Sequence, residues 1–237
     1  MTTTLITGAN KGLGFETARR LLEAGHTVFL GSRDPERGRR AAEQLGAHLV
    51  AIDVTDEASV AAAAEAVAAQ TGGSLDVLIN NAGIEARGPD NSVIGAADVT
   101  ADDMRTVFDT NVFGVVRVTH AFLPLLQKSA APVVVNVSSG LASISKAATP
   151  GTPVYLYPGV AYPTSKAAVN MITVQFAKAF PGMRVNAVEP GYTATDLNGR
   201  TGTQTVEQGA EIIVRMAQVG PDGPSGGYFD ANGPLAW

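Results

Sequence analysis

TTTLITGANKGLG, residues 2–14, joins a strand-like run to a glycine-rich turn that opens the first helical pattern. The β-branched and apolar residues at 2–7 predict a strand, because such side chains suit an extended, half-buried chain. Gly8, Gly12 and Gly14 then allow backbone N–H groups to approach a pyrophosphate at the helix N-terminus. Their spacing is not the general G-x-G-x-x-G, and a simple tight turn is the alternative. The strand-to-helix position favours a nucleotide-binding loop.

The same alternation of strand and helix continues along the chain. Capping patterns mark helix starts at Asp34, Thr100 and Thr205. Alternation at this spacing predicts an α/β domain, in which helices cover both faces of a mostly parallel sheet. Further strands are expected at residues 26–31, 47–52, 75–80, 131–137, 184–188 and 226–229, with helices near 13–24, 35–45 and 56–70.

The composition excludes several classes of protein. Hydrophobic residues make up 45% of the 237-residue chain and charged residues 16%, which is typical of a well-buried globular protein. The net charge of −5 disfavours a nucleic-acid partner or an anionic membrane surface. There is no cysteine and the three histidines lie far apart, so we expect no metal site. Without a signal-peptide pattern or an apolar run near the ~20 residues of a membrane span, we expect a cytoplasmic protein.

Further motifs follow the glycine loop in a definite order. They are NNAG at 80–83, Asn111, a serine after the strand at 131–137, and Tyr162 with Lys166 in YPTSK. In this order the motifs resemble those of the short-chain dehydrogenase/reductase family. The glycine loop, the segment GSRDPERG and the closing tryptophan are most similar to the carbonyl reductase branch of that family.

The resemblance implies a single-domain Rossmann fold over residues 1–237, with a doubly wound, mostly parallel, seven-stranded sheet. Its cofactor half would span approximately 1–130 and its catalytic and substrate half approximately 131–237. The proline- and glycine-rich segment 146–160 would be an insertion that forms a wall or lid of the substrate pocket. The candidate substrate contacts are Leu141, Tyr155, Tyr157 and Tyr192.

The end of the second strand indicates which nicotinamide cofactor is used. An acidic residue there binds the ribose 2′-hydroxyl, whereas a basic residue favours a 2′-phosphate. Ser32 stands where the acid is expected and Arg33 follows it, while Lys11 could supply a second positive charge. We therefore expect NADPH/NADP+ as the cofactor. The alternative is that Arg33 belongs to an ordinary solvated helix face, as we infer for the later arginines of that helix.

The resemblance also implies the other cofactor contacts. Asp53 would bind the adenine end, although a polar strand end is nearly as good an explanation. Thr193 and Thr195 in EPGYTATD would hold the carboxamide and a phosphate, whereas Glu189 in the same stretch has no assigned role. The full expected set is Gly8, Asn10, Lys11, Gly12, Leu13, Gly14, Arg33, Asp53, Val54, Asn80, Ala82, Gly83, Tyr162, Lys166, Pro190, Gly191, Thr193 and Thr195.

Tyr162 and Lys166 lie one helical turn apart, so both side chains can face the same point. A phenol with a pKa near ~10 is a poor proton relay at neutral pH, and a nearby ammonium lowers that pKa. Pro163 disfavours helical geometry at Tyr162, so we expect the helix to begin there. The positive end of the helix dipole would then favour the phenolate further.

Two more side chains complete the expected catalytic set. Only one of Ser138 and Ser139 can face the site, because a strand alternates its faces, and the family pattern selects Ser139. It would hydrogen-bond the substrate carbonyl and the hydroxyl of Tyr162. Asn111 would hold a water that links Lys166 to solvent. Alone, an asparagine in a helical segment would indicate a kink or a cap.

These observations lead to an NADPH-dependent oxidoreductase that reduces a small-molecule ketone or aldehyde, reversibly, with Tyr162 as proton donor. One alternative is a catalytically idle, NADP-binding sensor on the same fold, and another is an epimerase or dehydratase of the family. The helix at 162–180 is apolar on most sides and needs cover, either from the insertion or from a second subunit of a homo-oligomer.

Overall fold

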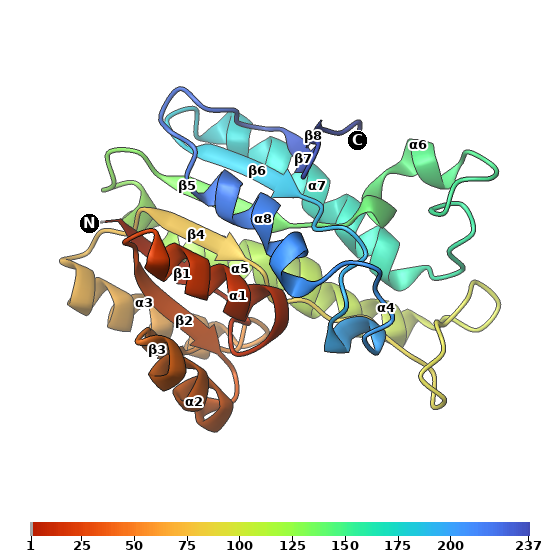
Figure 1. Ribbon diagram of the computed structural model, residues 1–237, viewed down its shortest axis with the longest axis horizontal. Coiled ribbons are helices and arrows are strands. Elements are labelled where there is room, and N and C mark those ends of the chain that lie inside the picture. Colours follow the sequence, from red (N-terminus) through yellow and green to blue (C-terminus); the bar gives the residue numbers. More distant parts are fainter. Residues whose placement is uncertain (1) are drawn as a thin grey trace.

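A twisted sheet runs through the protein, with helices on both faces (Figure 1). The structure is a computed structural model that describes residues 2–237. Over that range the strand order is β3-β2-β1-β4-β5-β6-β7-β8, parallel from β3 to β7, with β8 antiparallel to β7. The strands are β1 (Thr3–Ile6), β2 (Thr27–Ser32), β3 (His48–Ala51), β4 (Val77–Asn80), β5 (Val133–Val137), β6 (Arg184–Val188), β7 (Tyr228–Asp230) and β8 (Gly233–Pro234).

Helices form most of the connections between parallel strands. Asp34 caps one of them by accepting the backbone N–H of Arg37, and Thr100 and Thr205 begin capping boxes, as their patterns predict. Short helical turns, one π-helical (η1) and two 3₁₀ (η2, η3), interrupt the pattern. The elements are α1 (Gly12–Glu23), α2 (Pro35–Leu45), α3 (Glu57–Thr71), α4 (Ala101–Phe108), η1 (Asp109–Phe113), α5 (Gly114–Leu126), η2 (Gly140–Ala142), α6 (Ile144–Ala147), α7 (Ala161–Ala179), η3 (Asp196–Asn198) and α8 (Val206–Ala217).

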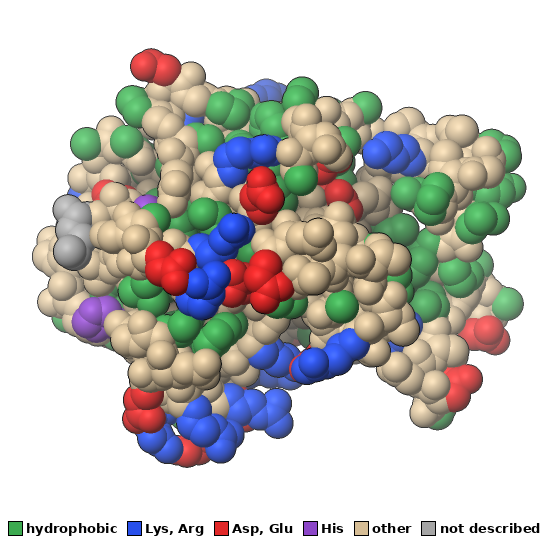
Figure 2. Space-filling model, in the orientation of Figure 1, with side chains coloured by type: hydrophobic (Ala, Val, Ile, Leu, Met, Phe, Trp, Pro, Cys, Tyr) green, Lys and Arg blue, Asp and Glu red, His purple; other side chains and the backbone are tan. Residues whose placement is uncertain are grey.

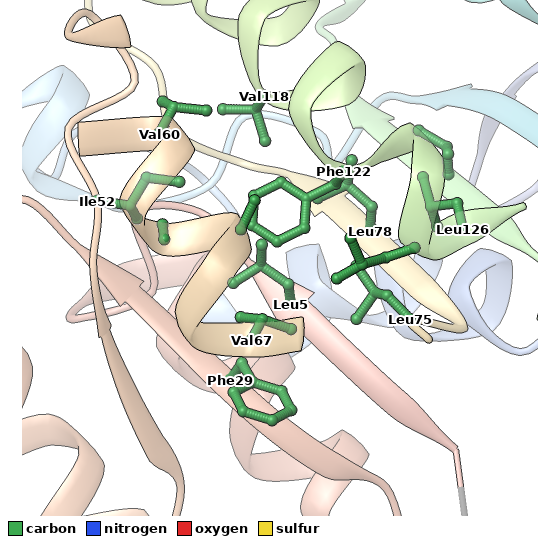
Figure 3. Packing of buried hydrophobic residues seen from close by; sticks show 14 of the residues in the cluster. Leu5, Phe29, Ile52, Val60, Val67, Leu75, Leu78, Val118, Phe122 and Leu126 are labelled. Carbon is green, nitrogen blue, oxygen red and sulfur yellow. The ribbon is translucent and has the colours of Figure 1, made fainter. Parts of the chain in front are cut away.

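The central strands are buried on both faces. Leu5 of β1 and Leu78 of β4 belong to the core beneath α3 and α5, where they meet Phe122 (Figure 3). Ile6 and Ile79, the next residue of each strand, belong to the opposite core, beneath α1 and α8. Successive side chains point to opposite faces of a sheet, so continuous apolar strands of this kind require helices on both sides.

The sheet topology confirms the predicted fold class, a doubly wound Rossmann-type α/β sheet. One short strand, β8, adds to the expected seven, because the chain turns back after Asp230 and pairs with β7. The strand order reverses between β1 and β4, and ligands of such sheets bind at the carboxyl ends of the strands at this point. Among the described helices, none is both long and apolar enough to span a membrane.

Candidate active site

The glycine loop between β1 and α1 depends on each of its three glycines. Gly8 and Gly12 have φ values of 63° and 56°, in the left-handed region where a side chain is unfavourable. A Cβ on Gly14 would lie 2.5 Å from Nδ2 of Asn81. That amide donates to the carbonyls of Thr7 and Gly8 and so holds the loop against the end of β4. Asn81 is a positioning residue absent from the expected set, although it lies within the NNAG motif.

Arg33 and Asp53 lie together at the carboxyl ends of β2 and β3. Arg33 is exposed and forms no ion pair with any described residue, whereas Arg37 and Arg39 of α2 pair with acids of their own helix. Asp53 accepts hydrogen bonds from the backbone and hydroxyl of Thr55. These bonds lower the pKa of Asp53, and the charge of Arg33 contributes. The place expected for the adenine-ribose end therefore offers one acceptor and one free guanidinium.

Lys11 takes part in a contact that its sequence position does not predict. Its ammonium forms an ion pair with Asp196 at 2.9 Å, and Asp196 also pairs with Arg200 at 3.1 Å. Thr195 lies against the glycine loop, since a Cβ on Gly12 would be 3.7 Å from its methyl group. The segment after β6 therefore packs against the glycine loop. Any contact between Lys11 and a phosphate would compete with the Asp196 carboxylate.

The expected cofactor residues at the end of β4 divide into two groups. The Asn80 amide points into the core, where it donates to Thr119 and to Asn136 of β5. Its side chain therefore joins two strands and a helix rather than projecting into the crevice. Gly83 faces the catalytic groups, because a Cβ there would lie 3.5 Å from the ammonium of Lys166 and 3.4 Å from Oδ1 of Asn111.

The segment after β6 supplies the other expected contacts. Pro190 is buried, and Gly191 has a φ of 81°. The Thr193 hydroxyl is buried and donates to the carbonyls of both. Tyr192, in contrast, is exposed, and its hydroxyl shares a hydrogen bond of 2.5 Å with Thr201. This geometry gives Thr193 a role in shaping the turn.

Tyr162 and Lys166 occupy the first turns of α7, on the face that meets the end of β5. The helix begins at Ala161, so the prediction that Pro163 lies near a helix start is confirmed. The Lys166 ammonium lies 5.6 Å from the centre of the Tyr162 ring and donates to the carbonyl of Val137 at 2.7 Å. Burial lowers the pKa of Lys166 to about 8.

The two serines after β5 point in different directions. Ser138 donates to Asn170 of α7 at 2.6 Å, within the interior. Ser139 accepts the backbone N–H of Leu141 at 3.3 Å, and its side chain lies within hydrogen-bonding reach of Tyr162. Strand alternation thus directs Ser138 into the interior and leaves Ser139, the serine expected from the family pattern, beside Tyr162.

Burial raises the pKa of Tyr162 in the protein chain alone. The charges of Glu85 and Glu189 add to this increase, while the hydrogen bond with Ser139 opposes it. Desolvation outweighs the lowering expected from Lys166 and the helix N-terminus. A phenol in this state stays protonated and can act as a proton donor. Lowering the pKa toward neutrality would depend on the positive nicotinium ring.

Asn111 lies in η1, the π-helical turn between α4 and α5. Its Oδ1 accepts the backbone N–H of Ile84 at 2.8 Å, and its Nδ2 donates to the Ile84 carbonyl and to Ser165. Asn111 therefore lies both within the π-helical distortion of the helix and close to Lys166. Its side-chain atoms fix the chain after NNAG, so a relay water would need another anchor, such as a backbone carbonyl.

The segment 146–160, expected to be an insertion and called the insertion below, projects from one end of the molecule, beside the segment after NNAG (Figure 1). Hydrophobic side chains are exposed at this end in Figure 2, and those of Tyr155 and Leu156 are among the exposed residues. The Tyr157 hydroxyl donates to Glu85, and Gly159 forms a bridge with Gly95. A small pocket beside Tyr162 lies between the two segments.

Tyr228 of β7 supports the site from a distant part of the sequence. Its hydroxyl donates to the backbone carbonyl of Ser139 at 2.5 Å, and its ring stacks on Trp237. The pattern around Tyr228 predicts only a strand. Its supporting role therefore becomes visible only when β7 is placed beside β6.

The family model for short chain dehydrogenases matches residues 2–206. The chain belongs to this family. The motifs that predicted membership are the residues that meet around Tyr162 and the glycine loop. As a short-chain dehydrogenase, the protein is an oxidoreductase, and the cofactors of the family are nicotinamide nucleotides.

Among the relatives of this short-chain dehydrogenase is the short-chain dehydrogenase anuI of Penicillium roqueforti, with 38% identity over 91% of this chain and 88% of that protein. Salutaridine reductase of Papaver bracteatum is 31% identical over 96% and 94%. Among solved structures, NADPH-bound carbonyl reductase from chicken fatty liver superimposes with a TM-score of 0.87 at 29% identity, covering 100% of this chain and 99% of the other.

Proposed function

We propose that this short-chain dehydrogenase is an NADPH-dependent reductase of ketones or aldehydes. The observation that carries the proposal is the convergence of Ser139, Tyr162 and Lys166 beside a pocket, at the same carboxyl edge of the parallel sheet as the glycine loop. The glycine turn, with positive φ at Gly8 and Gly12 and no room for a side chain at Gly14, and the free guanidinium of Arg33 fit a phosphorylated dinucleotide.

The side chains suggest how each step is assisted. When bound, NADPH supplies a hydride to the carbonyl carbon. Ser139 would orient the carbonyl oxygen by donating a hydrogen bond, and Tyr162 would donate a proton to the same oxygen. Lys166 would stabilise the phenolate that remains, because its ammonium lies close to the ring. Asn111 would keep the chain beside Lys166 in place for reprotonation.

The preference for NADPH over NADH rests on the end of β2. Ser32 is buried and its hydroxyl donates to the Asp34 carbonyl, so no carboxylate at that position would repel a phosphate. Arg33 is free to pair with it. The NADPH-bound relative from chicken liver supports the same choice.

The test is the consumption of NADPH by the purified chain with a panel of ketones and aldehydes, followed by identification of the products. Tyr162→Phe keeps the ring but loses the proton donor, so it should reduce kcat by at least about a hundredfold. Its dissociation constant for NADPH should stay within about twofold. Substantial turnover by Tyr162→Phe would overturn the mechanism.

The same panel distinguishes the other interpretations of the chain. An idle sensor would bind NADPH without consuming it in the presence of any carbonyl compound. An epimerase or dehydratase would give a product at the same net oxidation state as its substrate. Tyr162 and Lys166 are both present and lie close together, which favours an active enzyme over the idle sensor.

A further inference from the structure

A largely buried ion pair lies beside the proposed catalytic tyrosine, Tyr162. Glu85, two residues after the NNAG motif, has a side chain that is 7% exposed, and it pairs with Arg87 at 2.6 Å. The other carboxylate oxygen accepts the hydroxyl of Tyr157 from the insertion. The carboxylate is close enough to Tyr162 for its charge to raise the tyrosine pKa. Glu85 is therefore a charged group at the reaction site with no role in the proposed chemistry.

Glu85 is a charged residue in the lining of a pocket that is otherwise largely apolar. Asp103, the second acid of the lining, belongs to the capping box of α4, where one of its carboxylate oxygens accepts the backbone and hydroxyl of Thr100. Glu85 is the lining carboxylate whose charge acts on Tyr162. The remaining lining residues are Ala86, Val93, Ile94, Val99, Gly159, Val160 and Ala161.

The hydrogen-bonding capacity of this ion pair is not exhausted. A carboxylate has about four acceptor positions, and Arg87 and Tyr157 occupy two of those on Glu85. Nε of Arg87 is buried and has no hydrogen-bond partner among the described residues. Glu85 therefore retains acceptor capacity in the lining of the pocket, and its partner Arg87 retains an unpaired donor behind it.

We propose that Glu85 selects carbonyl substrates that carry a hydroxyl group remote from the carbonyl being reduced. The inference rests on the proposed reductase function and narrows its substrate class. A hydrocarbon ketone would cover the carboxylate without replacing the water it displaces, which is unfavourable. A hydroxyl group would donate to Glu85 and would offer an acceptor to Arg87, directly or through a water.

The chemistry of the pair favours a hydroxyl over an ammonium group. Arg87 already balances the charge of Glu85, so this carboxylate has little net charge left to attract a cation. An ammonium group also has no acceptor for Nε of Arg87. Sites that hydrogen-bond a substrate hydroxyl discriminate strongly against analogues without it, because their own polar groups are then left unpaired.

The test uses pairs of ketones that differ in one group: 3- and 4-hydroxycyclohexanone, each against the methylcyclohexanone of the same pattern. The wild-type chain should prefer the hydroxyl compound by about tenfold or more in kcat/KM. Glu85→Gln, which keeps an acceptor but loses the charge, should reduce that ratio several-fold, and Glu85→Leu should abolish it. Glu43→Gln, an exposed arginine-paired glutamate on α2, is the matched control and should leave the ratio unchanged.

A purely structural role for Glu85 predicts a different result. If the carboxylate only anchors the insertion through Tyr157, then Glu85→Gln and Tyr157→Phe would lower kcat/KM for both ketones of each pair equally. That result, or a wild-type ratio near one, would overturn the proposal. Glu85→Leu leaves Arg87 buried and unpaired, so Glu85→Gln, checked by thermal unfolding, keeps the test valid if the leucine variant does not fold.

The selectivity can also be measured without turnover. Calorimetry gives the dissociation constants of the same ketones for the Tyr162→Phe variant saturated with NADP+. This variant should bind the hydroxyl compound of each pair more tightly. The double variant Tyr162→Phe, Glu85→Leu should lose that preference. If the wild-type chain reduces no ketone, the proposed function fails, while this measurement still decides whether Glu85 selects hydroxyl groups. Equal affinities for both members of each pair would refute the selectivity alone.

Discussion

Lys166 carries its ammonium where burial opposes the charge. The side chain is 4% exposed, and burial lowers its pKa to about 8. In the unfolded chain the same lysine has its usual pKa near 10.5, so between about pH 8 and that value the unfolded state binds more protons. The free energy of unfolding contributed by Lys166 therefore rises with pH across this window.

This linkage gives a testable difference between the wild-type chain and Lys166→Met. Relative to the variant, the wild type should gain stability from about pH 8 to pH 10, where Lys166 loses its proton in the folded state first. Above about pH 10 the raised pKa values of Tyr162 and Tyr228 lower the stability of both proteins, because the folded state then retains their protons, and this effect cancels in the difference. Urea unfolding at several pH values measures the difference in free energy of unfolding between the two proteins. A difference that does not change with pH would contradict the prediction.

Arg33 should control the choice between the two nicotinamide cofactors. Arg33→Ala removes the free guanidinium at the end of β2, so NADPH binding should weaken by about tenfold to a hundredfold, a typical loss for a charge-assisted hydrogen bond. The affinity for NADH should change by less than about threefold. Fluorescence titration gives both dissociation constants.

Arg39→Ala provides a matched comparison for Arg33→Ala. Arg39 is also exposed, but it is paired with Glu36 and Glu43 on the surface of α2. Its loss should change neither affinity. Equal weakening of NADPH and NADH by Arg33→Ala would make Arg33 an ordinary surface residue.

At the scale of elements, local signals are the ones that could be predicted from the sequence. The glycine turn, the cap at Asp34 and the start of α7 each depend on neighbouring residues, and the structure confirms them. Contacts between distant segments could not be predicted in this way. The bonds from Tyr157 to Glu85 and from Tyr228 to Ser139 join residues 72 and 89 positions apart, and they depend on how the sheet brings loops together.

The direction of a side chain was equally hard to predict where it could point either to the cofactor site or to another part of the protein. Asn80 ends β4 with its amide in the core, because Asn136 on the adjacent β5 offers an acceptor there. Lys11 turns to Asp196, whose carboxylate lies 185 positions away in sequence. Motif order therefore located the site, but the partners of individual polar groups required the fold.

The two tyrosines of the insertion should differ in their effect on substrate binding. Tyr155 is 49% exposed, whereas the Tyr157 hydroxyl is bound by Glu85 at the pocket. Tyr157→Ala should therefore raise KM or change the order of preferred ketones more than Tyr155→Ala does. Neither change should alter the affinity for NADPH, because the insertion lies away from the glycine loop. Steady-state kinetics on a varied panel measures this, and no effect from either would make the segment a simple connector.

On the scale of the whole molecule, a group of apolar side chains is left in solvent on the helices beside the site. Met171 of α7 is 59% exposed, Phe113 of η1 is 54% exposed and Val116 of α5 is 39% exposed. The sequence suggested that either the insertion or a second subunit covers α7. The insertion does not cover Met171, which leaves the second subunit.

We therefore expect the protein to form a homo-oligomer in solution. Sedimentation at micromolar concentration should give at least twice the chain mass of 24.4 kDa. Met171→Glu should shift the distribution toward the monomer, since burying a carboxylate in an apolar contact is costly. The exposed Leu156→Glu on the insertion is the comparison and should have no such effect. A monomeric wild type would contradict this expectation.

The ion pair between Lys11 and Asp196 has a kinetic consequence. It connects the glycine loop to the segment after β6, and both segments are expected to hold the cofactor. We therefore expect that NADP+ can leave only after the ion pair breaks. Both side chains are about half exposed, and dissolved ions weaken such a pair over a Debye length of about 8 Å at physiological ionic strength. Added salt should thus shorten the residence time of the spent nucleotide. Where its departure limits the cycle, the protein would work faster in saltier solution.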